Sequence, residues 1–196
     1  MWDQIYGGDD YAYGTEPNTF LTQCADRLPV GRTLCIGEGE GRNAVFLARR
    51  GHRVTAVDGS RVGLAKAERL ARAGGVEVDI VITDLAHFAF DAAAWDCIVS
   101  IFCHLPPSLR AVVHRGVVHG LAPRGVLLLE AYTPRQLGFR TGGPPVAELM
   151  MNLSDLRGEL AGLRFEQGIE IEREVHEGCM HHGRSAVVQV LAVKDP

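Results

Sequence analysis

Excess positive charge, paired cysteines and long apolar runs are all missing from this 196-residue sequence. Its 20 Lys and Arg face 24 Asp and Glu, and the net charge of -4 leaves no basic footprint for nucleic acid or anionic lipid. Five cysteines without paired spacing argue against a disulfide framework. The first ten residues are acidic and aromatic, unlike a secretion signal, and no apolar run approaches the roughly 20 residues that cross a bilayer. We therefore expect a cytoplasmic protein that binds neither nucleic acid nor membrane.

What the sequence does contain is a regular alternation of short apolar runs and amphipathic stretches, typical of a parallel sheet with crossover helices. The pattern predicts one domain over 1–196, in which 1–30 is an N-terminal helical segment or lid and 31–196 is the core. Strands are expected at 34–36, 52–57, 76–82, 95–102 and 125–132, and helices at 43–50, 61–73 and 107–120. A last helix carries Leu149, Leu153, Leu156 and Leu160 on one side. The runs 169–175 and 185–193 are close enough to form an antiparallel pair. The fold class is therefore a doubly wound α/β sheet, mixed at one edge.

A glycine-rich loop, GEGEG at 37–41, follows the first strand and opens the first helix. This placement puts a ligand at the helix N-terminus, with Gly37 making the turn and Gly39 and Gly41 allowing close backbone approach. Asp58 ends the second strand 21 residues later, where a carboxylate accepts hydrogen bonds from ribose hydroxyls. Arg42 replaces the third glycine of the dinucleotide fingerprint, which disfavours NAD. The remaining alternatives are a plain tight turn for the glycines and a helix cap or solvated strand end for the Asp.

Together with Asp84 at the third strand tip, which suits an adenine amine, these residues resemble the class I S-adenosylmethionine-dependent methyltransferases. The resemblance implies a Rossmann-like, seven-stranded mixed sheet with the last strand antiparallel and helices on both faces. It also implies S-adenosylmethionine as cofactor. The cofactor-binding residues that it implies are Tyr13, Gly37, Glu38, Gly39, Gly41, Arg42, Asp58, Asp84, Leu85 and Ser100.

Two residues of the loop leave alternatives open. The family motif has an Asp where this sequence has Cys35, so Glu38 is a candidate substitute, while Cys35 itself fits a small buried hydrophobe. Arg42, a cation in the first helical turn, opposes the helix dipole. It is expected either to face the methionine carboxylate of the cofactor or to form a surface ion pair with Glu40 or Glu38.

The N-terminal run 2–21 and the tail 177–194, taken with GEGRNAVFLA at 39–48, resemble the tellurite-resistance and thiopurine type of small-molecule methyltransferase. In that group an N-terminal segment folds over the cofactor. Aromatic residues suited to such a lid are Trp2, Tyr6, Tyr11, Tyr13 and Phe20. Tyr13 is the best candidate to face the sulfonium. The alternative is a helix that packs its aromatics on the sheet.

The acceptor side is less defined by the sequence. FCHLPPSLR at 102–110 lacks the signature of nucleobase N-methylation, because Leu105 precedes the two prolines and Ser108 follows them. Ser100, Phe102 and His104 begin a loop at the carboxyl edge of the sheet, where His104 could orient a nucleophile or the methionine tail. An insertion after the fifth strand is expected to shape the acceptor pocket. Its polar candidates are Glu130, Tyr132, Arg135 and Arg140.

The tail segment HEGCMHHGRS, 176–185, permits three interpretations. A metal site is disfavoured because all the ligands fall in one hairpin. The second is a solvated turn. The third is an anion site in which Arg184 holds the acceptor and either His182 or His181 adds a donor. The predicted catalytic residues are thus His104, Tyr132, His182 and Arg184, with no metal.

The predicted function is methyl transfer to a small soft nucleophile, either a metalloid oxyanion such as tellurite or selenite, or a thiol. A soft nucleophile attacks without strong acid-base help, so the absence of an obvious general base does not exclude an enzyme. The alternatives are N- or O-methylation of a small metabolite and an inactive S-adenosylmethionine-binding regulatory protein.

Overall fold

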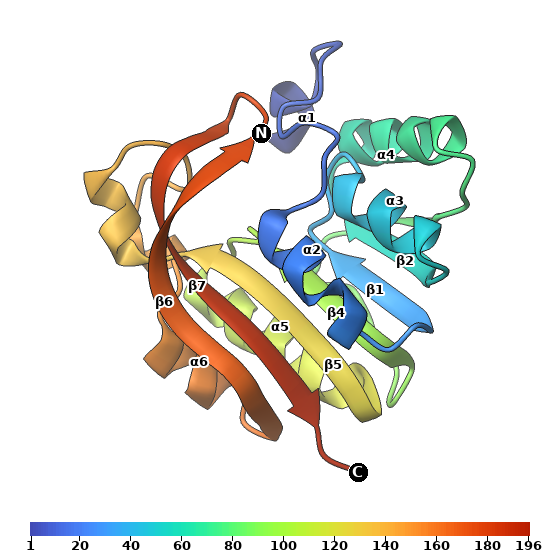
Figure 1. Ribbon diagram of the computed structural model, residues 1–196, viewed down its shortest axis with the longest axis vertical. Coiled ribbons are helices and arrows are strands. Elements are labelled where there is room, and N and C mark those ends of the chain that lie inside the picture. The colour runs from blue at the N-terminus through green and yellow to red at the C-terminus, as the bar shows by residue number, and fades with distance from the viewer.

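The computed structural model describes all 196 residues and builds one seven-stranded sheet in the order β3-β2-β1-β4-β5-β7-β6 (Figure 1). The strands are β1 (Arg32–Ile36), β2 (Arg53–Asp58), β3 (Asp79–Ile82), β4 (Trp95–Ile101), β5 (Leu121–Tyr132), β6 (Leu163–Glu177) and β7 (His181–Lys194). The α-helices are α1 (Trp2–Ile5), α2 (Thr19–Cys24), α3 (Arg42–Arg49), α4 (Arg61–Ala73), α5 (Pro107–Gly120) and α6 (Leu153–Glu159). β1 to β5 are parallel, and β7 pairs antiparallel with both β5 and β6. The predicted fold class is confirmed.

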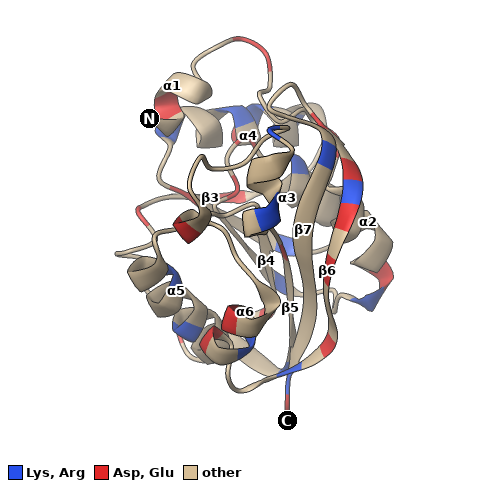
Figure 2. Cartoon of the chain, turned by 90° about the vertical axis from the view of Figure 1, so that its left-hand side faces the viewer, with Lys and Arg blue, Asp and Glu red and all other residues tan.

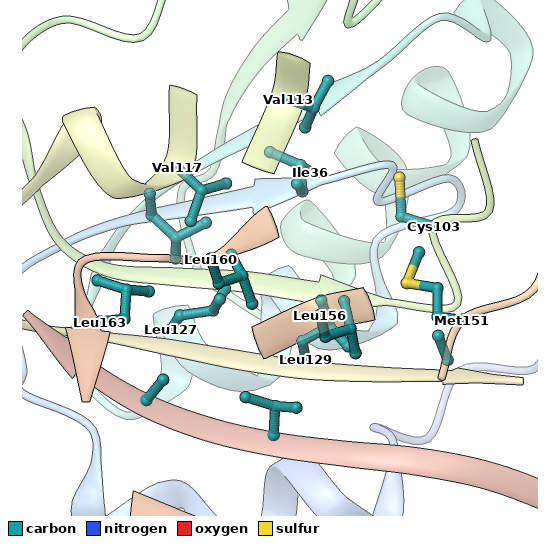
Figure 3. Close-up of a cluster of buried hydrophobic side chains, with 14 of the residues drawn as sticks. Ile36, Cys103, Val113, Val117, Leu127, Leu129, Met151, Leu156, Leu160 and Leu163 are labelled. Carbon is teal, nitrogen blue, oxygen red and sulfur yellow. The ribbon is translucent and has the colours of Figure 1, made fainter. Parts of the chain in front are cut away.

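Helices cover both faces of the sheet. α5 and α6 pack on one face, where Val113, Val117, Leu156 and Leu160 meet Leu127 and Leu129 of β5 (Figure 3). α2, α3 and α4 pack on the other face against β1, β2 and β4. Each central strand is therefore buried on both faces, which explains its continuous apolar sequence.

Local sequence signals place the long helices. The Ser60 side chain accepts the backbone N–H of Gly63 and so caps α4, which ends at Ala73 before Gly74. α5 opens with Pro107 in its first turn. Both helices have the bounds that the sequence predicts.

The closing hairpin is longer than the sequence indicates. β6 and β7 extend to Glu177 and His181, so the turn is only 178–180 and the residues 181–184 belong to a strand. β5 pairs with β7 only from Val187 to Val193, whereas β6 pairs with it as far as His181. The hairpin therefore projects past β5 toward the N-terminal segment, as Figure 1 shows. At the other edge of the sheet, β3 begins at Asp79 rather than at the predicted 76, because its pairing with β2 starts at Asp79.

Charged residues of both signs occur along the outer strand β6, mostly Glu with Arg164 and Arg173 among them (Figure 2). This strand has a free edge, and charges on such an edge discourage pairing with another chain. None of the helices is both long enough and apolar enough for a membrane span.

Candidate functional site

The carboxyl ends of the parallel strands meet at one edge of the sheet, and the predicted cofactor residues lie there. The glycine loop follows β1, Asp58 ends β2, and Asp84 comes two residues after β3. β1 is flanked by β2 on one side and β4 on the other, which is the switch point where open α/β sheets bind ligands.

All three glycines of the loop have positive φ, at 62°, 63° and 93° for Gly37, Gly39 and Gly41. Side chains of the protein approach them closely. A Cβ at Gly37 would lie 2.6 Å from the Cys103 sulfur, and a Cβ at Gly41 would lie 2.5 Å from the Cβ of Ala67 in α4. Gly41 therefore serves helix packing, in addition to the ligand approach that the sequence predicts.

Asp58 is buried and makes two backbone hydrogen bonds. One carboxylate oxygen accepts from the N–H of Gly39 at 2.9 Å, and the other accepts from that of Ser60 at 2.7 Å. Burial raises its pKa, against the effect of these hydrogen bonds. Because a carboxylate offers about four acceptor positions, each oxygen retains one for a ribose hydroxyl.

Glu38 caps the N-terminus of α3. One of its oxygens accepts the backbone N–H of Asn43 at 3.0 Å and that of Ala44 at 2.8 Å. Burial raises the pKa of Glu38 to about 7, although these bonds and the nearby Arg42 oppose the shift. Cys35 is fully buried in the apolar cluster below, as its alternative interpretation predicts.

The other predicted cofactor residues also lie at this edge. Asp84 is exposed and accepts the N–H of Ala86 at 2.9 Å, leaving one oxygen without a bond in the protein. Leu85 packs into the hydrophobic core, and Ser100 is buried near the end of β4.

The N-terminal segment lies directly on the glycine loop. The Tyr6 hydroxyl is 2.6 Å from where a Cβ at Gly39 would stand, and the Tyr6 ring covers Gly63. The backbone N–H of Tyr13 donates to Glu40, whose carboxylate also forms a buried ion pair with Lys66 at 2.8 Å. In this structure the aromatic segment is therefore packed over the predicted ribose site.

Arg42 is buried, and its partner is neither Glu40 nor Glu38. Its guanidinium donates to Glu177 of β6 at 2.5 Å, across 135 residues of sequence. The predicted surface ion pair is therefore wrong, because the β6–β7 hairpin brings a carboxylate over the N-terminus of α3. This contact offsets the unfavourable position of a cation in the first helical turn.

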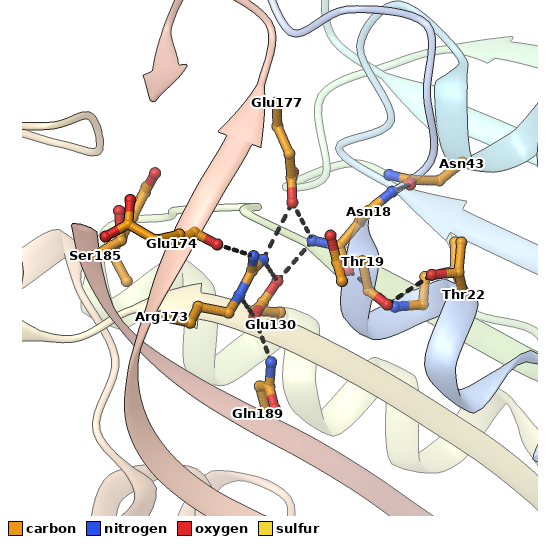
Figure 4. Close-up of polar contacts among 12 residues, drawn as sticks. Asn18, Thr19, Thr22, Asn43, Glu130, Arg173, Glu174, Glu177, Ser185 and Gln189 are labelled. Atoms are coloured by element: carbon orange, nitrogen blue, oxygen red, sulfur yellow. Dashed lines mark hydrogen bonds and ion pairs between the residues drawn. The ribbon is translucent and has the colours of Figure 1, made fainter. Parts of the chain in front are cut away.

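Glu177 belongs to a buried polar network between the N-terminal segment and the last strands (Figure 4). Arg173 donates to both Glu130, at 2.7 Å, and Glu177, at 3.1 Å. The Asn18 amide donates to the same two carboxylates, at 2.6 and 2.9 Å. Both carboxylates and both guanidiniums of this network are thus paired.

Five rings gather beside this network at the carboxyl ends of β4 and β5. They belong to Tyr13, Phe102, His104, Tyr132 and His181, and we call them the aromatic cluster. The His181 centroid lies 4.5 Å from that of Tyr13, 4.6 Å from that of Phe102 and 5.2 Å from that of Tyr132. Phe102 has a φ of 52°, which is rare for a residue with a side chain and is found preferentially at functional sites.

Both imidazoles of the aromatic cluster are neutral near pH 7. Burial lowers the pKa of His104 to about 4 and that of His181 to about 3. His104 Nδ1 lies 3.0 Å from the carbonyl of Leu149. In contrast, the His181 Nδ1 and the Tyr132 hydroxyl are buried without any hydrogen-bond partner.

His182 and Arg184 lie away from the other predicted catalytic residues. Both side chains are exposed on the opposite side of the strand, and His182 faces His176 while Arg184 pairs with Glu172 at 2.6 Å. Strand alternation points His181 inward instead. The sequence left His182 and His181 as alternative donors, because treating 176–184 as a turn hid the strand register that places His181 inward. No three His, Cys, Asp or Glu side chains converge to form a metal site.

The insertion after β5 borders a cavity of about 420 Å³. Its lining includes Gln136, Arg140 and Met150, and the backbone of the glycine pair Gly142–Gly143. A Cβ at Gly142 would lie 3.0 Å from both the Tyr132 hydroxyl and the His181 ring. The glycine pair therefore lines the cavity and also contacts the aromatic cluster.

Comparison with known proteins agrees with this geometry. A family model described as "Methyltransferase domain" matches residues 33–125. None of the curated proteins matches the sequence.

Several solved structures share the fold. One concerns conversion of a disulfide bond into a thioacetal group during echinomycin biosynthesis (18% identity, 99% of this chain, 90% of that chain, TM-score 0.80). Another is TehB from Haemophilus influenzae (17% identity, 99% of this chain, 66% of that chain, TM-score 0.74). A third is a SAM-dependent methyltransferase from Methanosarcina mazei (18% identity, 92% of this chain, 99% of that chain, TM-score 0.68). At these identities the likeness is one of fold.

Proposed function

We propose that the chain is a class I S-adenosylmethionine-dependent methyltransferase and that it methylates a small soft nucleophile, either a thiol or a metalloid such as tellurite or selenite. The acceptor enters from the cavity beneath the insertion and meets the methyl group at the aromatic cluster. The cofactor supplies an activated methyl group, and the protein's part is to hold and align the two reactants.

The residues at the carboxyl edge fit the cofactor. Asp58 has acceptor positions for both ribose hydroxyls, and Asp84 has a free oxygen for the adenine amine. Glu38, beside the N-terminus of α3, takes the place of the motif carboxylate and holds the methionine ammonium. Within the aromatic cluster, Tyr13 contacts both Tyr6, which packs on the glycine loop, and His181, and its ring face can meet a sulfonium cation there.

One observation carries the choice of a soft nucleophile: the aromatic cluster contains no strong base. His104 and His181 have pKa values of about 4 and 3, so neither can remove a proton from an alcohol at neutral pH. A polarizable sulfur or metalloid attacks without that help, and alignment with exclusion of water supplies the rate. O-methylation is correspondingly disfavoured.

The test is turnover with purified protein. The cofactor is incubated with tellurite, selenite, 2-mercaptoethanol and a thiopurine, and formation of S-adenosylhomocysteine is measured. At least one of these acceptors should yield product, and Asp58→Ala should abolish it at low cofactor concentration. Cofactor binding without product from any acceptor would replace the proposal with a regulatory cofactor-binding protein.

A further inference from the structure

We propose that the Tyr132 hydroxyl and the His181 Nδ1 together hold the methyl acceptor, and that this acceptor is electrically neutral at its reacting end. The inference rests on the proposed function and narrows its substrate class. It begins from two buried polar atoms that the folded chain leaves unsatisfied.

Both atoms are well placed to meet one ligand. Tyr132 is fully buried at the end of β5, and His181, 6% exposed, opens β7, with their ring centroids 5.2 Å apart. The nearby Ser185 hydroxyl opposes the rise that burial causes in the Tyr132 pKa, but it donates its proton to the Gly183 carbonyl and also bonds Thr141, so the Tyr132 hydroxyl is left without a hydrogen bond of normal geometry. Because buried polar groups in folded proteins are almost always paired, two orphans on one surface indicate a partner that the chain itself does not supply.

The backbone above this pair is built for close approach. Gly142 and Gly143, with φ of 136° and 87°, lie close to the Tyr132 hydroxyl and ring respectively. A side chain at Gly143 would come within 2.6 Å of that ring. A shift of this glycine pair opens the pair of polar atoms to the cavity of about 420 Å³ on its other side.

Charge at the aromatic cluster decides the substrate class. The two cations nearest to it, Arg42 and Arg173, are already matched by Glu130 and Glu177. Arg184 is outside, paired with Glu172. An anionic reacting group would be buried there without a counterion, which is strongly unfavourable. Arg140 is exposed and lines the cavity together with the glycine pair, so it can meet a charge on the part of an acceptor that lies in the cavity.

A neutral thiol fits this arrangement throughout the reaction. Its S–H donates to the imidazole nitrogen, and the tyrosine hydroxyl donates to the distal polar group or to a sulfur lone pair. The second sulfur lone pair forms the new bond to the methyl carbon, while the electrons of the broken bond remain with the cofactor sulfur. The acceptor is then a protonated thioether cation facing aromatic rings, which favour cations, and its proton passes through the imidazole to water.

The test compares benzyl mercaptan, a neutral thiol, with tellurite and selenite, whose charge is on the reacting group. Wild-type protein should favour the thiol by at least about tenfold in kcat/KM. Tyr132→Phe and His181→Phe, which keep a ring and lose the polar atom, should each raise the KM for the thiol about five- to tenfold, as expected for one neutral hydrogen bond. Cofactor affinity and the Tm of Tyr132→Phe should stay unchanged. His119→Asn, on the exposed end of α5, is the matched control.

A preference for the oxyanions, or an unchanged KM in both variants, would overturn the inference. If no acceptor is methylated, the proposed function fails. Calorimetry then tests separately whether the Tyr132 hydroxyl and the His181 Nδ1 bind a ligand. Benzyl alcohol is then titrated into protein saturated with S-adenosylhomocysteine. Binding to wild type that is lost in both variants supports the site, and absent or equal binding refutes it.

Discussion

The proposed contact between Glu38 and the methionine ammonium requires an ionised carboxylate, so cofactor affinity should fall in mild acid. Glu38 already accepts two backbone N–H groups of α3, and burial raises its pKa to about 7. As the pH falls through this pKa, the carboxylate becomes protonated and can no longer bind the ammonium group. Between pH 7.0 and 5.5 the ionised fraction drops from about one half to about 3%. The dissociation constant should therefore rise roughly 16-fold, equivalent to about 1.6 kcal/mol.

Calorimetric titration with S-adenosylhomocysteine over this range measures the effect. The amino group of the ligand stays protonated there, since α-amino groups titrate near 7.7–8.0. Glu38→Gln keeps the size of the side chain and should bind more weakly with no dependence on pH. Circular dichroism at pH 5.5 checks that the fold is intact. A flat wild-type profile, or a slope that survives in Glu38→Gln, would refute the role given to this carboxylate.

Three further outcomes are expected. Gly39→Val places a side chain against the Tyr6 hydroxyl, and Asp58→Ala removes the ribose acceptor. Each variant should stay folded and bind the cofactor at least about tenfold more weakly in calorimetry. Wild-type affinity in both would contradict the assignment of the cofactor site. Glu159→Gln should lower urea stability by about 3–5 kcal/mol, because it leaves the buried Arg110 without its counterion. Against the effect of burial, bonds from His114 and Arg110 lower the Glu159 pKa to about 2, so this stability is present above about pH 4.5 and is lost toward pH 2. Amides near Tyr6 should exchange slowly even without cofactor, because the ring is already packed; fast exchange in the free protein would contradict this packing.

Local signals explain what the sequence could predict. Helix α4 is flanked directly by the Ser60 cap and by the glycine pair at 74–75. Asp58 follows the glycine loop at the spacing that one βαβ unit imposes. The choice between His181 and His182 could not be made from sequence, because the side on which a strand residue points depends on register and the glycines at 178 and 183 made this part of the strand look like a turn. The Arg42 partner was likewise out of reach, since Glu177 is 135 residues away in sequence.

The contact between the N-terminal segment and the closing hairpin has a consequence for folding. A Cβ at Gly178, in the hairpin turn, would overlap the backbone of Ala12 and Gly14, and Asn18 is fixed by carboxylates on β5 and β6. The two hydrogen bonds of the Asn18 amide span 112 and 159 residues of sequence. Because pairings between distant parts of a chain close slowly, we expect the segment over the site to become ordered only after β5 and β6 have joined the sheet.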